Sequence, residues 1–220
     1  MVIQVLVFRG EILNIQPGWR SLDSMARKRI RDIRNEELIE ATIVTVHKRG
    51  YAAVTMAEIA REAGASAASI SYYFGSKEGL MEATMRHLLR KLRRAMVEGY
   101  AQAETPIERL YAVMDANFAD SLFTVPQCSI WMQFWANAPY SPRLARLHRI
   151  NRARVISHFL AELSQLVAPD QIETARQALQ SYMDGVWLQA AQSDGPLDSQ
   201  AARFAAHRVV DLVTSREMVA

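Results

Sequence analysis

The stretch TMAEIAREAGASAASISYYFGSKEGL, from Thr55 to Leu80, predicts two short helices joined by a tight turn. Thr55 and Glu58 have the T-x-x-E spacing of a capping box, which starts the first helix. Gly64 follows where a left-handed residue ends a helix, a conformation that glycine adopts without steric cost. Ser66 can then cap the second helix. The stretch therefore predicts a helix-turn-helix.

The second of these helices begins with small, uncharged residues, Ala67, Ala68 and Ser69. A slim tip of this kind can enter a DNA major groove, where the Ser69 hydroxyl can bond a base and alanine methyls can meet a thymine methyl. The same residues can also be small packing residues of a helix pair that binds nothing. Both interpretations stay open at this stage.

Residues around the motif carry groups that bind phosphate. The segment from Met25 to Arg34 has five basic residues and one acidic residue, so it can form a minor-groove arm or a solvated tail. Lys77 lies in the first turn of the next helix, where the helix dipole favours an anion and disfavours a lysine. The predicted DNA-binding residues are Arg27, Lys28, Arg29, Thr55, Ser66, Ala67, Ala68, Ser69, Tyr72, Tyr73 and Lys77.

The pattern A-x-x-A-G-A-S-x-x-x-I-S-Y-Y-F-x-S-K-E-x-L resembles the DNA-binding domain of the TetR family of bacterial transcriptional regulators, over roughly residues 35–80. The resemblance implies a three-helix DNA-binding domain, a larger helical ligand domain and a two-fold dimer. It also implies a palindromic double-stranded DNA operator, a cytoplasmic location and release of DNA when a small molecule binds.

Caps and apolar spacing along the chain predict helices only, about nine in all. We therefore expect an all-α fold, with a helix-turn-helix DNA-binding domain over residues 25–80 and an effector-binding and dimerisation domain over residues 81–220. Pro126 is expected to precede the sixth helix, while Pro169 opens the eighth and Gly195 ends it. We expect residues 1–24 to be a disordered extension or a mis-assigned start.

Composition argues against other classes of protein. The net charge of the 220 residues is +3, and Cys128 is the single cysteine, so no intramolecular disulfide is possible. The sequence has no nucleophile with a paired base, no metal-ligand spacing, no phosphate loop and no apolar run that could cross a membrane. We expect neither enzymatic activity nor a cofactor nor a metal. A helical architectural DNA-binding protein is the remaining alternative from another class.

Three segments, GSKEGLMEATMRHL, IWMQFWANAPYSPRL and YMDGVWLQAAQSDGPLD, resemble the choline-responsive BetI repressors within that family, with matches spread over roughly Glu37 to Val213. The resemblance implies control of choline and glycine betaine metabolism, whereas related ligand domains serve other effectors. Aromatic faces and a carboxylate suit a quaternary ammonium ion. Aromatic residues at helical spacing are also common in cores, so cage and core remain two interpretations. The candidate effector-binding residues are Trp131, Phe134, Trp135, Tyr182, Asp184 and Trp187.

The last two helices are expected to form the homodimer. Small and apolar groups share one face of the eighth helix, which would allow close packing against a second copy. The residues predicted on this face are Ala178, Tyr182, Gly185, Val186 and Gln189.

Overall fold

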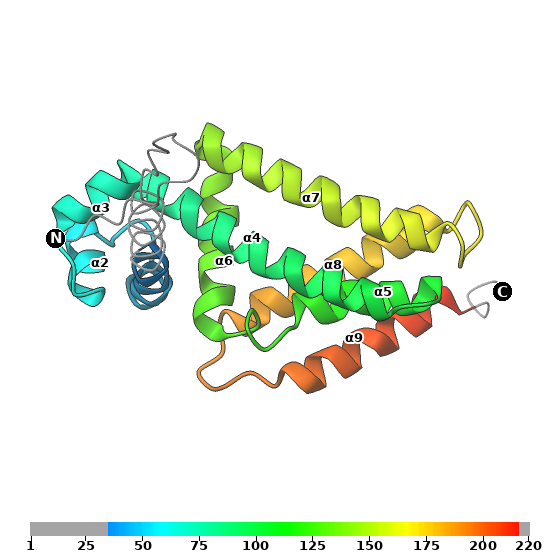
Figure 1. Cartoon of the computed structure of the whole chain (residues 1–220). Coiled ribbons are helices and arrows are strands. Elements are labelled where there is room, and N and C mark those ends of the chain that lie inside the picture. Colours follow the sequence, from blue (N-terminus) through cyan, green and yellow to red (C-terminus); the bar gives the residue numbers. More distant parts are fainter. Residues whose placement is uncertain (1–34, 216–220) are drawn as a thin grey trace, which may run out of the picture. The chain divides into compact units, whose positions relative to one another are not determined.

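The computed structural model describes residues 35–215, and all regular secondary structure in that range is helical, as predicted (Figure 1). Residues 35–49 form the helix that precedes the helix-turn-helix. The helices that follow are α2 (Met56–Glu62), α3 (Ala67–Phe74), α4 (Lys77–Gln102), α5 (Pro106–Asn117), α6 (Val125–Asn137), the short 3₁₀ helix η1 (Ala138–Tyr140), α7 (Pro142–Leu163), α8 (Ile172–Ala190) and α9 (Ser199–Thr214).

The chain divides after residue 37 into two units, and the larger unit comprises residues 38–220. The expectations for residues 1–24 and for Arg27, Lys28 and Arg29 lie outside the described residues. Within the larger unit α4 contacts α3 and also α5, α6 and α7 (Figure 1). One continuous helix thus connects the helix-turn-helix with the helices that follow it, and the domain boundary at residue 80 stays a prediction.

The signals that predicted the helix-turn-helix are confirmed in its local structure. The Thr55 side chain accepts the Glu58 N–H while the Glu58 carboxylate accepts the Thr55 N–H, which completes the capping box. Gly64 has φ +59°, the left-handed conformation expected after α2. The Ser66 hydroxyl accepts the Ser69 N–H at 3.1 Å and starts α3.

The boundaries predicted for α6 and α8 were wrong by a few residues. Thr124 caps α6, so Pro126 lies inside its first turn rather than before it. A turn closed by the Gln171 N–H and the Ala168 carbonyl contains Pro169, and α8 begins only at Ile172. At its other end α8 stops at Ala190, before Gly195. The last backbone hydrogen bonds after Ala190 are those of a turn rather than of an α-helix.

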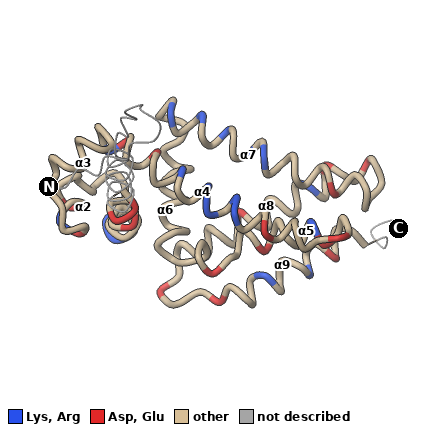
Figure 2. Tube along the Cα trace, in the orientation of Figure 1, with Lys and Arg blue, Asp and Glu red and all other residues tan. Residues whose placement is uncertain are grey.

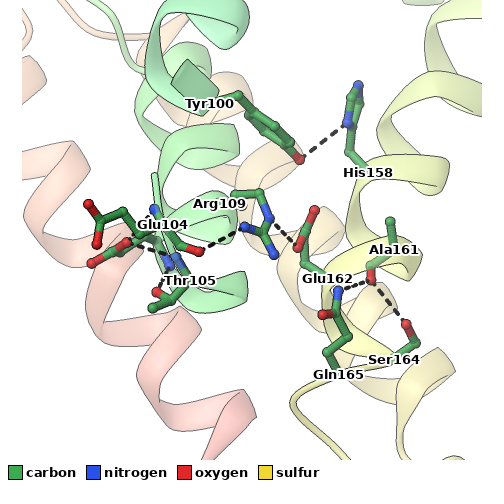
Figure 3. A network of polar contacts seen from close by, with 10 residues as sticks. Tyr100, Glu104, Thr105, Arg109, His158, Ala161, Glu162, Ser164 and Gln165 are labelled. Atoms are coloured by element: carbon green, nitrogen blue, oxygen red, sulfur yellow. Dashed lines mark hydrogen bonds and ion pairs between the residues drawn. The ribbon is translucent and has the colours of Figure 1, made fainter. Parts of the chain in front are cut away.

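Hydrogen bonds and an ion pair connect α4 and α5 to α7 (Figure 3). The Arg109 guanidinium on α5 donates from Nε to Glu162 Oε2 of α7 at 2.7 Å, and the Glu162 side chain is buried. Tyr100 Oη of α4 lies 3.3 Å from His158 Nδ1 of α7, and the two rings meet edge to face. A carboxylate this deeply buried requires its partner, so α5 and α7 are held at a fixed register.

Candidate DNA interface and effector cavity

The N-terminal tip of α3 is small, uncharged and open. Ala67 and Ala68 are exposed, and Ser69 is partly buried. The Ser66 and Ser69 hydroxyl oxygens lie 2.9 Å apart, so each hydroxyl has a partner at the start of the helix. Base contact by Ser69 stays a prediction. It would require the Ser69 hydroxyl to bond a base either in addition to its bond with Ser66 or in place of that bond.

The two tyrosines at the end of α3 differ in exposure. The Tyr72 side chain is exposed, with 83% of its surface accessible, whereas Tyr73 packs against the hydrophobic core. Their ring centroids lie 5.2 Å apart, edge to face. Ile70 is fully buried and Phe74 is partly buried, so both side chains pack inside the chain. Of the two hydroxyls, that of Tyr72 is free to meet a phosphate.

Lys77 makes contacts that the sequence did not suggest. Its ammonium group donates to the carbonyl oxygens of Tyr51 at 2.9 Å, Ala52 at 3.2 Å and Val54 at 3.1 Å. The same nitrogen lies 4.8 Å from the centroid of the Tyr51 ring. An ammonium group has three protons, and all three have acceptors inside the chain. Lys77 therefore fastens the start of α4 to the loop that precedes α2, and its phosphate contact stays a prediction.

The Thr55 hydroxyl is engaged in the capping box as well. It accepts the Glu58 N–H at 3.2 Å and donates to the Glu58 carboxylate at 2.9 Å. Its predicted phosphate contact would compete with the second of these bonds. Of the predicted phosphate donors among residues 35–215, Tyr72 thus needs the least rearrangement.

A cavity of about 220 Å³ lies among the later helices. Residues of α4, α5, α6, α7 and α8 line it. The lining residues are Leu92, Asn117, Trp131, Trp135, His148, Asn151, Arg152, Val155, Gln180, Met183, Asp184 and Trp187. Its volume is below the roughly 300–1,000 Å³ of pockets that hold drug-sized ligands. The cavity therefore suits a ligand of few heavy atoms.

Three tryptophans converge on this cavity from two helices. The ring of Trp131 on α6 meets that of Trp187 on α8 at 5.6 Å between centroids and 85° between planes. Trp135, one turn further along α6, lies 6.2 Å from Trp131. Such rings offer both faces and edges, and a face attracts a cation.

The charged groups of the cavity are Asp184 and Arg152. Burial raises the pKa of Asp184, and the nearby Arg152 guanidinium partly opposes that rise. Arg152 Nη1 lies 3.9 Å from Asp184 Oδ2, and both side chains are partly exposed. His148 remains neutral near pH 7, because burial and then Arg152 lower its pKa. The carboxylate of Asp184 thus has one loose ionic partner at the rim of the cavity.

Buried ring nitrogens of the lining residues lack partners. Trp131 Nε1, Trp187 Nε1 and His148 Nδ1 have no hydrogen-bond partner among the described residues. An unpaired buried polar group costs about 1–3 kcal/mol. These nitrogens can therefore gain from a small polar group that a ligand brings close.

Four of the six predicted effector residues line the cavity together: Trp131, Trp135, Asp184 and Trp187. Phe134 does not; it is fully buried and packs on Trp131 and His148. Tyr182 is partly buried outside the lining. His148 of α7 lines the same cavity as Asp184 of α8.

The residues that sequence reasoning missed come chiefly from α7. His148, Asn151, Arg152 and Val155 lie at i, i+3, i+4 and i+7, and therefore on one face of that helix. Polar residues at this spacing, between the apolar positions of a packed helix, were the available signal. The sequence alone could not separate them from a solvated face.

The helix-turn-helix and the cavity, both lined or contacted by α4, define a DNA-binding regulator. A family profile for bacterial regulatory proteins of the TetR family matches residues 38–84, and one described as "BetI-type transcriptional repressor, C-terminal" matches residues 106–214. The HTH-type transcriptional regulator BetI of Burkholderia thailandensis is 37% identical over 86% of this chain and 97% of its own length. The BetI of Burkholderia lata is 36% identical over 88% of this chain and 100% of its own.

Solved structures of other regulators have the same fold as this chain. A putative transcriptional regulator from Pseudomonas aeruginosa PAO1 has a TM-score of 0.66 at 22% identity, over 84% of this chain and 91% of its own. A putative regulator from Saccharomonospora viridis, solved in complex with choline, has a TM-score of 0.67 at 21% identity, over 80% of this chain and 95% of its own. The chain belongs to the TetR family of transcriptional regulators and is of BetI type. Regulators of this family bind DNA operators as dimers. Within residues 35–215, no helix is both long and apolar enough to cross a membrane.

Proposed function

We propose that this regulator is a cytoplasmic repressor that binds a palindromic operator as a homodimer and releases it when choline enters the cavity of Trp131, Trp135 and Trp187. The observation that carries the proposal is that these three rings and Asp184 line one cavity. A quaternary ammonium ion has no N–H to donate, so ring faces and one counter-charge are what can hold it.

The size and polarity of the cavity support choline over a larger effector. About 220 Å³ accommodates a compact trimethylammonium group with a short arm. Each cation–π contact is worth about 0.5–2 kcal/mol, more when water is excluded. The hydroxyl of choline can pair with the neutral His148 or with an indole N–H, both of which lack partners among the described residues. The choline in the Saccharomonospora viridis relative supports the same ligand class.

A path from the cavity to the DNA-binding helices supports the release step. Trp131 and Trp135 belong to α6, and Gln133, between them, accepts the backbone N–H of Tyr51 at 3.2 Å. α4 is tied to the start of α7 as well, since the Ser141 hydroxyl donates to Glu78. A ligand that favours one arrangement of α6 can thus shift the helix-turn-helix, provided that its affinity differs between the two states.

Exposed apolar residues on α8 and α9 support the homodimer. Leu188, Phe204 and Leu212 have 48%, 70% and 61% of their surface exposed. On the face of α8 predicted from sequence, a Cβ added to Gly185 would meet nothing within 4 Å. A helical glycine costs about 1 kcal/mol relative to alanine, and one chain alone gives no reason for it. Close approach of a second copy supplies that reason.

The test is fluorescence anisotropy of a labelled duplex from the promoter region of the gene, titrated with choline at constant salt. We expect choline to release the duplex, while sodium chloride of equal ionic strength does not. Tight operator binding that choline leaves unchanged would leave the regulator in place but disprove choline as its effector. Equal binding of operator and random DNA would instead favour the architectural alternative.

A further inference from the structure

A second and larger cavity lies between α4 and α7. It is an open groove of about 600 Å³, compared with about 220 Å³ for the effector cavity. Its lining residues are Leu89, Leu92, Arg93, Met96, Val97, Tyr100, Ala101, Asn151, Arg154, Val155 and His158. Choline would fill little of this volume, so a larger ligand fits the groove better.

The floor of the groove is apolar. Leu89, Leu92 and Val155 are buried beneath it, and Met96 packs beside them. Val97 has 60% of its surface exposed, which is unusual for a valine on a packed helix. An alkyl chain laid along these residues would remove apolar surface from water, which favours binding.

The rim of the groove is cationic. Arg93 on α4 and Arg154 on α7 are both exposed, and no carboxylate within residues 35–215 makes an ion pair with either. Figure 2 shows further lysine and arginine residues along both helices. None of the residues that line the groove is acidic. The groove thus combines an apolar floor with uncompensated positive charge.

At the far end of the groove the polar groups already have partners. Tyr100 and His158 bond each other, and the carboxylate whose charge acts on both, that of Glu162, is engaged by Arg109 (Figure 3). Burial raises the pKa of Tyr100 to about 12, so its hydroxyl carries no charge at neutral pH. Arg93 and Arg154 are therefore the groups that remain free to bind an anion.

We propose that this groove binds a second small molecule, an anionic amphiphile whose alkyl chain lies on Leu89, Met96 and Val97 and whose carboxylate or phosphate pairs with Arg93 and Arg154. Guanidinium groups pair with such oxyanions through two parallel hydrogen bonds. The proposal does not depend on choline as the effector, because the two cavities differ in charge and in most of their residues.

Isothermal titration calorimetry of the full-length protein with decanoate, below its micelle concentration, tests the proposal. We expect saturable binding, with the uncharged decanol binding at least about tenfold more weakly. Decyl phosphate in place of decanoate distinguishes the two oxyanions. The variant R93Q/R154Q should lose at least about tenfold in affinity for decanoate.

The matched control is R94Q/R149Q, which removes one exposed arginine from each of the same two helices but none from the groove. It should bind decanoate as the unmodified protein does. Circular dichroism confirms that both variants fold, and choline titrations of both variants report on the effector cavity separately. No saturable decanoate binding, equal losses in the two variants, or equally tight binding of decanol would each overturn the proposal.

Discussion

The side chain of Gln133 accepts the backbone N–H of Tyr51 at 3.2 Å, although 82 residues separate them along the chain. Gln133 lies on α6 between two tryptophans of the effector cavity, and Tyr51 lies in the loop that Lys77 fastens to α4. This bond joins the ligand cavity to the helix-turn-helix without passing along α4.

The first prediction concerns this bond. Gln133→Leu removes the acceptor, so choline should still bind while its effect on operator affinity shrinks. The coupling free energy is typically about 1–3 kcal/mol, and we expect it to fall by at least half. Choline titrations with and without duplex measure it. Gln133→Glu keeps a carbonyl-like acceptor and should retain the coupling; equal coupling in the two variants would show that the bond has no part in it.

The second prediction concerns Lys77. Lys77→Met should lower the free energy of unfolding by about 1–3 kcal/mol, because it leaves three carbonyl oxygens without their charged donor. Urea denaturation measures the change. Lys48→Met is the control, since the exposed Lys48 makes only a 3.4 Å ion pair with Glu62 and should change stability by less than about 0.5 kcal/mol. Unchanged stability with lost operator binding would instead favour the phosphate contact predicted from sequence.

The third prediction separates the two tyrosines of α3. Tyr72→Phe should weaken operator binding about tenfold, because the exposed hydroxyl loses a bond to phosphate. Tyr73→Phe should leave it unchanged, since this side chain packs against the core. Anisotropy with the operator duplex compares the two. The reverse order would place the phosphate contact at Tyr73.

The fourth prediction uses the opposite charges at the cavity. Asp184→Asn should weaken choline binding, whereas Arg152→Gln should strengthen it by removing a competing cation 3.9 Å from the carboxylate. Calorimetry gives both affinities. If the effector were an anion, the two substitutions would act in the opposite directions.

Asp184 also gives choline binding a dependence on pH. Choline keeps its charge at every pH, so its affinity should rise with pH as the carboxylate ionises. Burial raises the pKa of Asp184 from its ordinary value of 3.8, and the loss on acidification therefore begins at a higher pH than for an exposed aspartate. In the Asp184→Asn variant this contribution should be lost, and the pH dependence that remains should come from protonation of His148.

The fifth prediction concerns the dimer. Phe204→Asp should dissociate it, since a carboxylate would be buried against apolar groups of the partner. Gly185→Leu should do the same by blocking close approach, although one chain has room for the side chain. Light scattering after size exclusion gives the mass. Tyr140→Asp, which changes a side chain that is 87% exposed on η1, is the control and should remain dimeric.

Local signals predicted most of the fold. Caps at Thr55 and Ser66 lie where the sequence suggested, because a cap depends on a few neighbouring residues. The start of α8 was missed, since Gln171 makes no side-chain cap and Pro169 belongs to the preceding turn.

The candidate sites were less accessible to sequence reasoning. Aromatic residues are conspicuous in a sequence, so the three tryptophans that line the cavity were among the candidates predicted from it. Whether a ring faces a cavity or the core depends on tertiary packing, and Phe134 faces the core. The role of Lys77 was missed for the same reason. Its carbonyl partners are 23 to 26 residues away along the chain, and no spacing rule connects them.

The uncharged tip of α3 has a consequence for how much information the operator can carry. Ala67, Ala68 and Ser69 include no arginine, asparagine or glutamine, the side chains that discriminate a base through two simultaneous hydrogen bonds. Recognition through this tip must then rest on methyl contacts, on the single hydroxyl of Ser69, and on the sequence-dependent stiffness and groove width of the duplex. Operator variants that preserve duplex geometry should therefore be tolerated more readily than those that alter it.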